Sequence, residues 1–130
     1  MYSKGVRMQT KYGFALDKWQ AAKKEMQEIL VEQARKCETI SYGDLSRMIP
    51  SLSLDPRDNA MYGMLDEISR DNAALGKTPL ATLVVQKSSG RPGTGYFRKT
   101  FPQHLPPEEL EVLWQQELQR VCADWAKNNS

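Results

Sequence analysis

Residues 78–101 constrain the fold more than any other stretch of this 130-residue chain. The stretch reads TPLATLVVQKSSGRPGTGYFRKTF, with an apolar run at 80–85, a serine-, glycine- and proline-rich loop at 88–95, and then Tyr96 and Phe97. Two short apolar runs joined by such a loop are typical of a β-hairpin. We therefore predict two short strands that form a wing beside the rest of the domain.

Positive charge is concentrated in this region. Five lysines and arginines lie between residues 77 and 104, and no acidic residue occurs among them. The first 16 residues are also basic, with Lys4, Arg7 and Lys11 and no acid. Because the net charge is only +2, the charge is segregated rather than in large excess. Segregated positive charge favours a surface that binds a polyanion or an acidic partner.

Amphipathic helices are predicted on both sides of the wing. Apolar residues spaced i, i+3, i+4, i+7 predict a helix over 17–37 with one buried face. A similar pattern follows Pro106 and Pro107 and predicts a C-terminal helix that packs back on the domain. No apolar run reaches the 18 residues that a membrane span needs. We therefore expect a cytoplasmic protein.

Two shorter helices are predicted before the wing. Ser41 with Asp44 three positions later is a capping-box variant, and it starts a helix that must end before Pro50. The pair Asp55-Pro56 predicts the start of a third helix, which Gly76 terminates. A helix that follows another after a short connection is typical of a helix-turn-helix.

The predicted fold class is α+β, mainly helical: a winged helix-turn-helix with a two-stranded wing and a packed C-terminal helix. We expect residues 1–16 to be a flexible basic N-terminal arm, because they show no periodicity and termini of this kind are often mobile. Residues 17–130 are expected to form a single winged-helix domain.

The sequence indicates no metal site and no cofactor. Cys37 and Cys122 each lie on an apolar helical stripe, so we interpret both as small buried hydrophobic residues. His104 is the only histidine, and it has no partner at a metal-ligand spacing. No paired acidic cluster and no Ser-His-Asp set stands out, which argues against catalysis.

Several short motifs occur in an order that is informative as a set. They are Ile40-Ser41-Tyr42-Gly43-Asp44-Leu45, Ala60-Met61-Tyr62-Gly63, the run 80–85, Ser88-Ser89-Gly90 and Gly95-Tyr96. This order resembles the C-terminal DNA-binding and active-site domain of alkylguanine-DNA alkyltransferases and the alkyltransferase-like proteins, over about residues 18 to 120. The resemblance implies that Tyr42 presses on the phosphate of a flipped nucleotide and that Tyr96 lines the base pocket.

This sequence departs from that family at the positions that carry the family's alkyl-transfer chemistry. Matching residues 84–85 to the family's Val-Val pair puts Ala81 at the reactive cysteine, Thr82 at the histidine that relays its proton, and Leu83 at the arginine. A methyl group cannot accept an alkyl group, so we expect no alkyl transfer. Ala60 falls on the family's arginine that enters the DNA stack. The resemblance therefore implies a scaffold whose means of flipping and repairing a base is lost or altered.

These patterns predict a non-enzymatic DNA-binding protein that uses a basic wing and a helix-turn-helix. The resemblance implies an alkyltransferase-like, non-catalytic relative that lacks the reactive cysteine. It would hold duplex DNA mainly through phosphate contacts. The residues expected to contact nucleic acid are basic, polar or aromatic: Tyr42, Arg57, Asn59, Lys87, Arg91, Tyr96, Arg98 and Lys99. Four acids are expected on the solvent face of the third helix and would oppose deep entry into a groove: Asp58, Asp66, Glu67 and Asp71.

Two other hypotheses remain open. A protein-interaction module, an adaptor or inhibitor, would place the same basic wing on an acidic partner surface. An enzyme that acts on nucleic acid is the third, although the glycine-rich loop precedes a predicted strand rather than the helix that phosphate cradling needs. The wing charges also have a plain structural explanation, because exposed hairpins are commonly basic for solubility.

Overall fold

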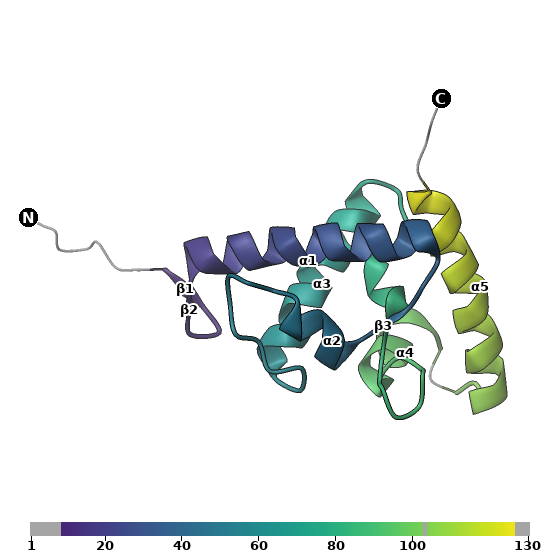
Figure 1. Ribbon diagram of the computed structural model, residues 1–130. Helices are drawn as coiled ribbons and strands as arrows, with labels where there is room; N and C mark the ends of the chain where they lie inside the picture. The colour runs from purple at the N-terminus through teal and green to yellow at the C-terminus, as the bar shows by residue number, and fades with distance from the viewer. Residues whose placement is uncertain (1–8, 103, 127–130) are drawn as a thin grey trace, which may run out of the picture.

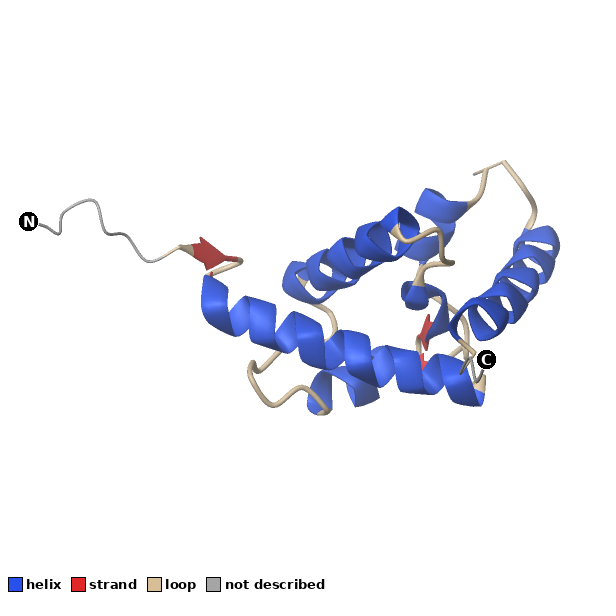
Figure 2. Ribbon diagram, turned by 90° about the horizontal axis from the view of Figure 1, so that it is seen from above, coloured by secondary structure: helices blue, strands red, loops and turns tan. Residues whose placement is uncertain are grey.

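The computed structural model describes residues 9–102 and 104–126, and within them the protein is mainly helical (Figure 1). Its helices are α1 (Leu16–Lys36), α2 (Tyr42–Arg47), α3 (Asn59–Ala74), the 3₁₀-helix η1 (Leu80–Leu83), α4 (Thr94–Thr100) and α5 (Pro107–Trp125). Its strands are β1 (Thr10–Lys11), β2 (Phe14–Ala15), β3 (Ile40–Ser41) and β4 (Val84–Val85). Figure 2 shows how little strand this part of the chain contains. The predicted class, α+β and mainly helical, is confirmed.

The 3₁₀-helix η1 lies at the centre of the fold. It contacts α1, α3 and α5, and its residues Leu80 and Leu83 are fully buried. The helix α1 runs along one side of the molecule, while α5 packs against its C-terminal end at a steep angle (Figure 1). The buried stripe of α1, which includes Met26 and Leu30, covers this centre as its periodicity predicts. The segment around residue 80 is therefore held from three sides.

The predicted two-stranded hairpin is wrong. Val84–Val85 pair in parallel with Ile40–Ser41, not with Tyr96 and Phe97. Those two aromatic residues lie in α4, and their rings cluster with that of Phe101, the residue after the helix, with centroids 5.5 to 6.4 Å apart. Successive side chains of a strand point to opposite faces, so a strand would separate rings that a helical turn brings together. The loop before α4 closes on itself, since Gln86 N–H donates to the Arg91 carbonyl.

The sequence signals for the short helices have mixed outcomes. Ser41 caps α2 and accepts a hydrogen bond from Asp44 N–H at 3.0 Å, as predicted. Gly76, with φ of 73°, follows the end of α3, as predicted. The predicted start of α3 at Asp55 is wrong, because the Asp55 carboxylate accepts from Arg57 N–H at 2.9 Å and holds a turn there instead. Residues 48–58 thus connect α2 to α3, a longer link than the usual helix-turn-helix turn.

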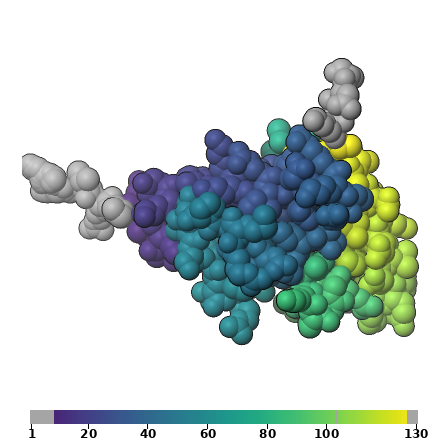
Figure 3. All heavy atoms as spheres, in the orientation of Figure 1, coloured from purple at the N-terminus to yellow at the C-terminus, as the bar shows by residue number. Residues whose placement is uncertain are grey.

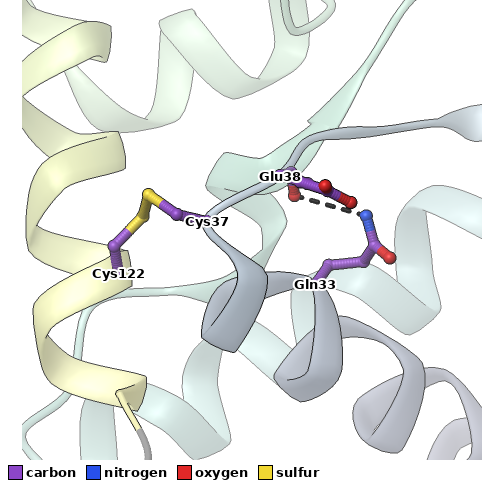
Figure 4. The surroundings of a disulfide bond; sticks show 4 residues. All are labelled: Gln33, Cys37, Glu38 and Cys122. Atoms are coloured by element: carbon purple, nitrogen blue, oxygen red, sulfur yellow. Dashed lines mark hydrogen bonds between the residues drawn. A yellow bond between two sulfur atoms is a disulfide. The ribbon is translucent and has the colours of Figure 1, made fainter.

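The interpretation of the two cysteines as free buried residues is wrong. Cys37 and Cys122 form a disulfide with their Cα atoms 5.2 Å apart, across a sequence separation of 85 (Figure 4). Cys37 lies just after α1 in the left-handed conformation, and Cys122 lies on α5. Beside it, the Gln33 amide donates to the Glu38 carbonyl. The apolar stripes do place both cysteines where α1 meets α5, but the pairing itself depends on how the helices pack.

The described part of the predicted arm folds onto the domain. The strands β1 and β2 form a small antiparallel hairpin with Tyr12 in its turn. The Tyr12 ring stacks on Trp19 of α1, with centroids 5.3 Å apart. Lys11 also pairs with Glu67 of α3 at 2.6 Å. Lys4 and Arg7 of the predicted arm lie outside the described residues.

No helix within 9–102 and 104–126 has the length and apolar character that crossing a bilayer requires.

Candidate functional site

A cavity of about 450 Å³ lies between α3 and α4. One face of α3 forms the first wall, α4 forms the second, and the segment that leads into η1 closes the interior. The lining residues are Tyr42, Asn59, Tyr62, Leu65, Asp66, Ser69, Pro79, Ala81, Gly95, Tyr96, Lys99 and Thr100. Its size lies within the range of small-molecule sites, and its lining combines apolar surface with polar and charged side chains that could orient a ligand.

Helical spacing explains why α3 presents this wall. Asn59, Tyr62, Asp66 and Ser69 follow one another at intervals of three or four residues, so they share one face of α3. Leu65 adds an apolar surface to the same wall. The opposite face of α3 is buried in the core. The cavity is therefore the side of α3 that the core leaves uncovered.

Three tyrosines give the cavity aromatic walls. The ring of Tyr42, at the start of α2, lies with its centroid 5.6 Å from that of Tyr62. The Tyr42 hydroxyl accepts a hydrogen bond from Gly93 N–H at 3.4 Å, which ties α2 to the entrance of α4. Burial raises the pKa of Tyr42, so its hydroxyl keeps its proton at neutral pH.

Tyr96 is held in place from inside the fold. Its hydroxyl lies 3.1 Å from the hydroxyl of Thr82, which is fully buried. Burial raises the pKa of Tyr96 to about 12, so it is neutral at any physiological pH. The Thr82 carbonyl in turn accepts from the indole N–H of Trp114 on α5 at 3.0 Å. A chain of contacts from α5 through Thr82 thus fixes the α4 wall.

An ion pair connects the two walls of the cavity. Lys99 of α4 lies 3.1 Å from one carboxylate oxygen of Asp66 on α3. The second oxygen of Asp66 lies 3.3 Å from Arg70 on the same helix. Asp66 is the more enclosed partner, since its side chain is 34% exposed and that of Lys99 is 66% exposed.

The structure brings together four of the eight residues predicted to contact nucleic acid. Tyr42, Asn59, Tyr96 and Lys99 all line the cavity. The other four do not line it: Arg57, Lys87, Arg91 and Arg98.

These four residues lie on the surface in different settings. Lys87 and Arg98 are exposed, on the loop after β4 and on α4 respectively. The Arg57 guanidinium Nε lies 3.8 Å from the carboxylate of its neighbour Asp55. The green segment after β4 forms a lobe at the lower edge of the molecule, beside the yellow-green α5 (Figure 3).

Arg91 is engaged by α5. Its guanidinium Nε lies 2.8 Å from the Glu111 carboxylate. The same Glu111 oxygen is buried and accepts no hydrogen bond from any described residue. The contact with Arg91 is therefore an ion pair that lacks the alignment of a hydrogen bond. Arg91, which lies in the loop of the predicted wing, is therefore already paired with an acid of this chain.

Sequence reasoning missed Tyr62 and Ser69 and misplaced two acids. Asp66 was expected on the solvent face of α3, yet it lines the cavity. Glu67 was expected there too, yet its side chain is only 12% exposed and accepts from the Trp19 indole at 3.1 Å. The spacing of Asn59, Tyr62, Asp66 and Ser69 was the signal available in the sequence.

The position matched to a reactive cysteine also lies at the cavity. Ala81 is half-buried and lines it, while Thr82 and Leu83 point into the core and are fully buried. Tyr42 of α2 and Ala81 and Tyr96 of the 78–101 stretch therefore line one space. Among the described residues, no group of three or more histidine, cysteine or acidic side chains is arranged to hold a metal ion.

Comparisons of the chain with protein-family models, with curated proteins and with solved structures found no match.

Proposed function

We propose that this protein is a non-enzymatic DNA-binding protein that holds duplex DNA on the surface around the α3–α4 cavity. One observation carries the proposal: Tyr42, Ala81 and Tyr96 line a single cavity. The resemblance to alkyltransferase-like domains assigns these three positions to the phosphate contact, the reactive residue and the base pocket. If the likeness of these short motifs were accidental, there would be no reason for the three residues to line the same cavity.

The charges around the cavity support the same proposal. Arg98 and Lys99 are exposed on α4, and Arg70 is exposed one turn along α3 from Asp66. Lysine and arginine beside a cavity lined by three tyrosines suit a ligand made of bases and phosphates. In this proposal α2 and α3 act as the helix-turn-helix pair, and residues 86–100 take the place of the wing.

The cavity wall supports binding without alkyl transfer. Ala81 presents a methyl group where the resembling family has its nucleophile. The two cysteines of the chain are joined to each other, and neither lines the cavity. A thiolate is the form that accepts an alkyl group, and a disulfide offers none.

Binding of a fluorescent duplex, followed by anisotropy at several salt concentrations, tests this proposal. We expect measurable affinity at low salt and a negative slope of log K against log salt. Lys87→Ala with Arg98→Ala should reduce that slope by about one to two. Lys18→Ala with Lys24→Ala removes two exposed charges from α1 and is the matched control, which should change the slope little. No binding at low salt would refute the proposal.

A protein-interaction module is the second candidate, and the Arg91–Glu111 contact favours it. Arg91 already binds a carboxylate at 2.8 Å, which is the chemistry that an acidic partner surface would offer. An adaptor or inhibitor would exchange Glu111 for an acid of its partner. The duplex experiment separates the two candidates, because this one predicts no salt-dependent DNA binding.

A further inference from the structure

We propose that the cavity selects a nucleobase that carries an exocyclic amino group, and that Asp66 is the residue that makes the selection. On binding, Lys99 leaves Asp66 and contacts a phosphate of the same strand. The inference rests on the proposed function and adds to it the class of base and the residue that reads it.

The hydrogen-bonding inventory of the cavity leads to this proposal. Asn59, Ser69 and Thr100 each carry groups that both donate and accept, so they satisfy either kind of base edge. An ionised aspartate only accepts and a lysine only donates. Discrimination between base edges therefore falls to Asp66 and Lys99.

The exposure of the two side chains indicates whether Lys99 or Asp66 stays in the cavity when a ligand binds. The Lys99 side chain is 66% exposed and that of Asp66 is 34% exposed, so the lysine is the member that can turn outward. Its ammonium group lies on a flexible stem, and exposed pairs of this kind are weak. Asp66 remains beside Arg70, which offsets the charge of its carboxylate. Each carboxylate oxygen keeps a further acceptor site for a ligand.

Chemistry then identifies the preferred base. A carboxylate accepts well from an exocyclic amino group, as acidic side chains do from cytosine N4. The ring N–H of uracil or thymine lies between two carbonyl oxygens, which a carboxylate repels. Cytosine and uracil have the same shape, so shape alone cannot separate them. The aromatic rings of Tyr42, Tyr62 and Tyr96 would stack on either.

The experiment uses two duplexes that differ in one unpaired base, cytosine or uracil, and a third that is fully paired. We expect the parent protein to bind the cytosine duplex about tenfold more tightly than the uracil duplex, which corresponds to one well-made contact. Asp66→Asn keeps the size of the side chain but donates and accepts, so the ratio should fall close to one. Lys99→Ala should weaken binding to all three duplexes by a similar factor.

Asp58→Asn is the matched control, because it makes the same change of charge at the residue that precedes α3, outside the cavity. It should raise the affinity for every duplex and leave the cytosine-to-uracil ratio unchanged. Circular dichroism would verify that each variant is folded.

Failure of this inference and failure of the proposed function give different results. Tight binding of the paired duplex with equal affinity for cytosine and uracil overturns the selection by Asp66 and leaves DNA binding standing. No binding of any duplex overturns the proposed function. The cavity is then tested alone, by titrating dCMP and dUMP against the tyrosine resonances in NMR spectra. A preference for dCMP that Asp66→Asn removes would uphold the selection, and equal or absent binding would overturn it.

Discussion

Replacing Gly63 by alanine tests how firmly the N-terminal hairpin is docked on α3. Gly63 lies in the second turn of that helix, and the ring of Tyr12 packs against it. A Cβ atom at position 63 would lie 2.7 Å from two atoms of the Tyr12 ring, a distance that requires the ring to move. Because Tyr12 is about half exposed, at 54%, the ring can swing outward. It would then lose its stacking on Trp19.

Two opposing terms of similar size follow from this geometry. Alanine in place of glycine inside a helix stabilises the fold by about 1 kcal/mol. Loss of the stacking between Tyr12 and Trp19 costs about 1 kcal/mol. Gly63→Ala alone should therefore change the free energy of unfolding little. In a Tyr12→Ala background the ring is absent, and the same replacement should stabilise the protein by about 1 kcal/mol.

Urea unfolding of the four proteins, followed by far-UV circular dichroism, measures both terms. The double-mutant cycle should give a coupling of about 1 kcal/mol between positions 12 and 63. If Gly63→Ala stabilises both backgrounds equally, Tyr12 does not lie on α3 in solution, and the docking of the hairpin is refuted.

Three further predictions concern the crosslink, the loop and the buried acid. Cys37→Ser with Cys122→Ser removes a link across a separation of 85 residues and should lower the free energy of unfolding by about 2–4 kcal/mol; a reducing agent should lower the Tm of the parent but not of this variant. Glu111→Gln releases Arg91, so duplex affinity measured by anisotropy should rise severalfold with a steeper salt dependence; an unchanged slope would show that Arg91 does not meet phosphate. Burial alone would raise the pKa of Glu67, but the hydrogen bonds and positive charges around it prevail and lower that pKa. Its contribution to stability is therefore complete above the ordinary glutamate pKa of about 4.3 and is lost as pH falls through the lower folded value, so Glu67→Gln should flatten the acid limb of a Tm-against-pH curve.

The helices α1, α2, α3 and α5 could be predicted because their signals are local. The apolar period of α1 and α5, the Ser41 cap and the glycine after α3 each act within a few residues. The run 80–85 was different, because a short apolar run is compatible with a strand or with a buried turn of helix. Here its first four residues form η1 and only the last two form a strand. The partner of that strand, β3, lies more than 40 positions earlier in the sequence, where local rules cannot find it.

In the candidate site, too, the residues with a local sequence signal could be predicted, whereas the features that depend on tertiary packing could not. Tyr42 and Tyr96 were found through an ordered set of motifs, and they do line one cavity. Asp66 was assigned to solvent, because the helical pattern shows which face of α3 avoids the core but not that α4 covers it. The disulfide was missed for a similar reason, since the meeting of α1 with α5 is a property of tertiary packing. A disulfide persists in an oxidising environment and is rare in the cytosol, so the cytoplasmic location stays a prediction.

The two tryptophans of α5 make a rigid template for the cavity wall. Trp114 donates to the Thr82 carbonyl and Trp125 to the Thr78 carbonyl, each at 3.0 Å. The two donors lie eleven positions apart on α5, a spacing of about 16 Å along the axis that the helix keeps constant. Residues 78–82 are therefore held in position by a helix that lies far from them in the sequence. Insertion of one residue in α5 between the tryptophans would turn one indole away by roughly 100°, and could deform the cavity without changing any residue that lines it.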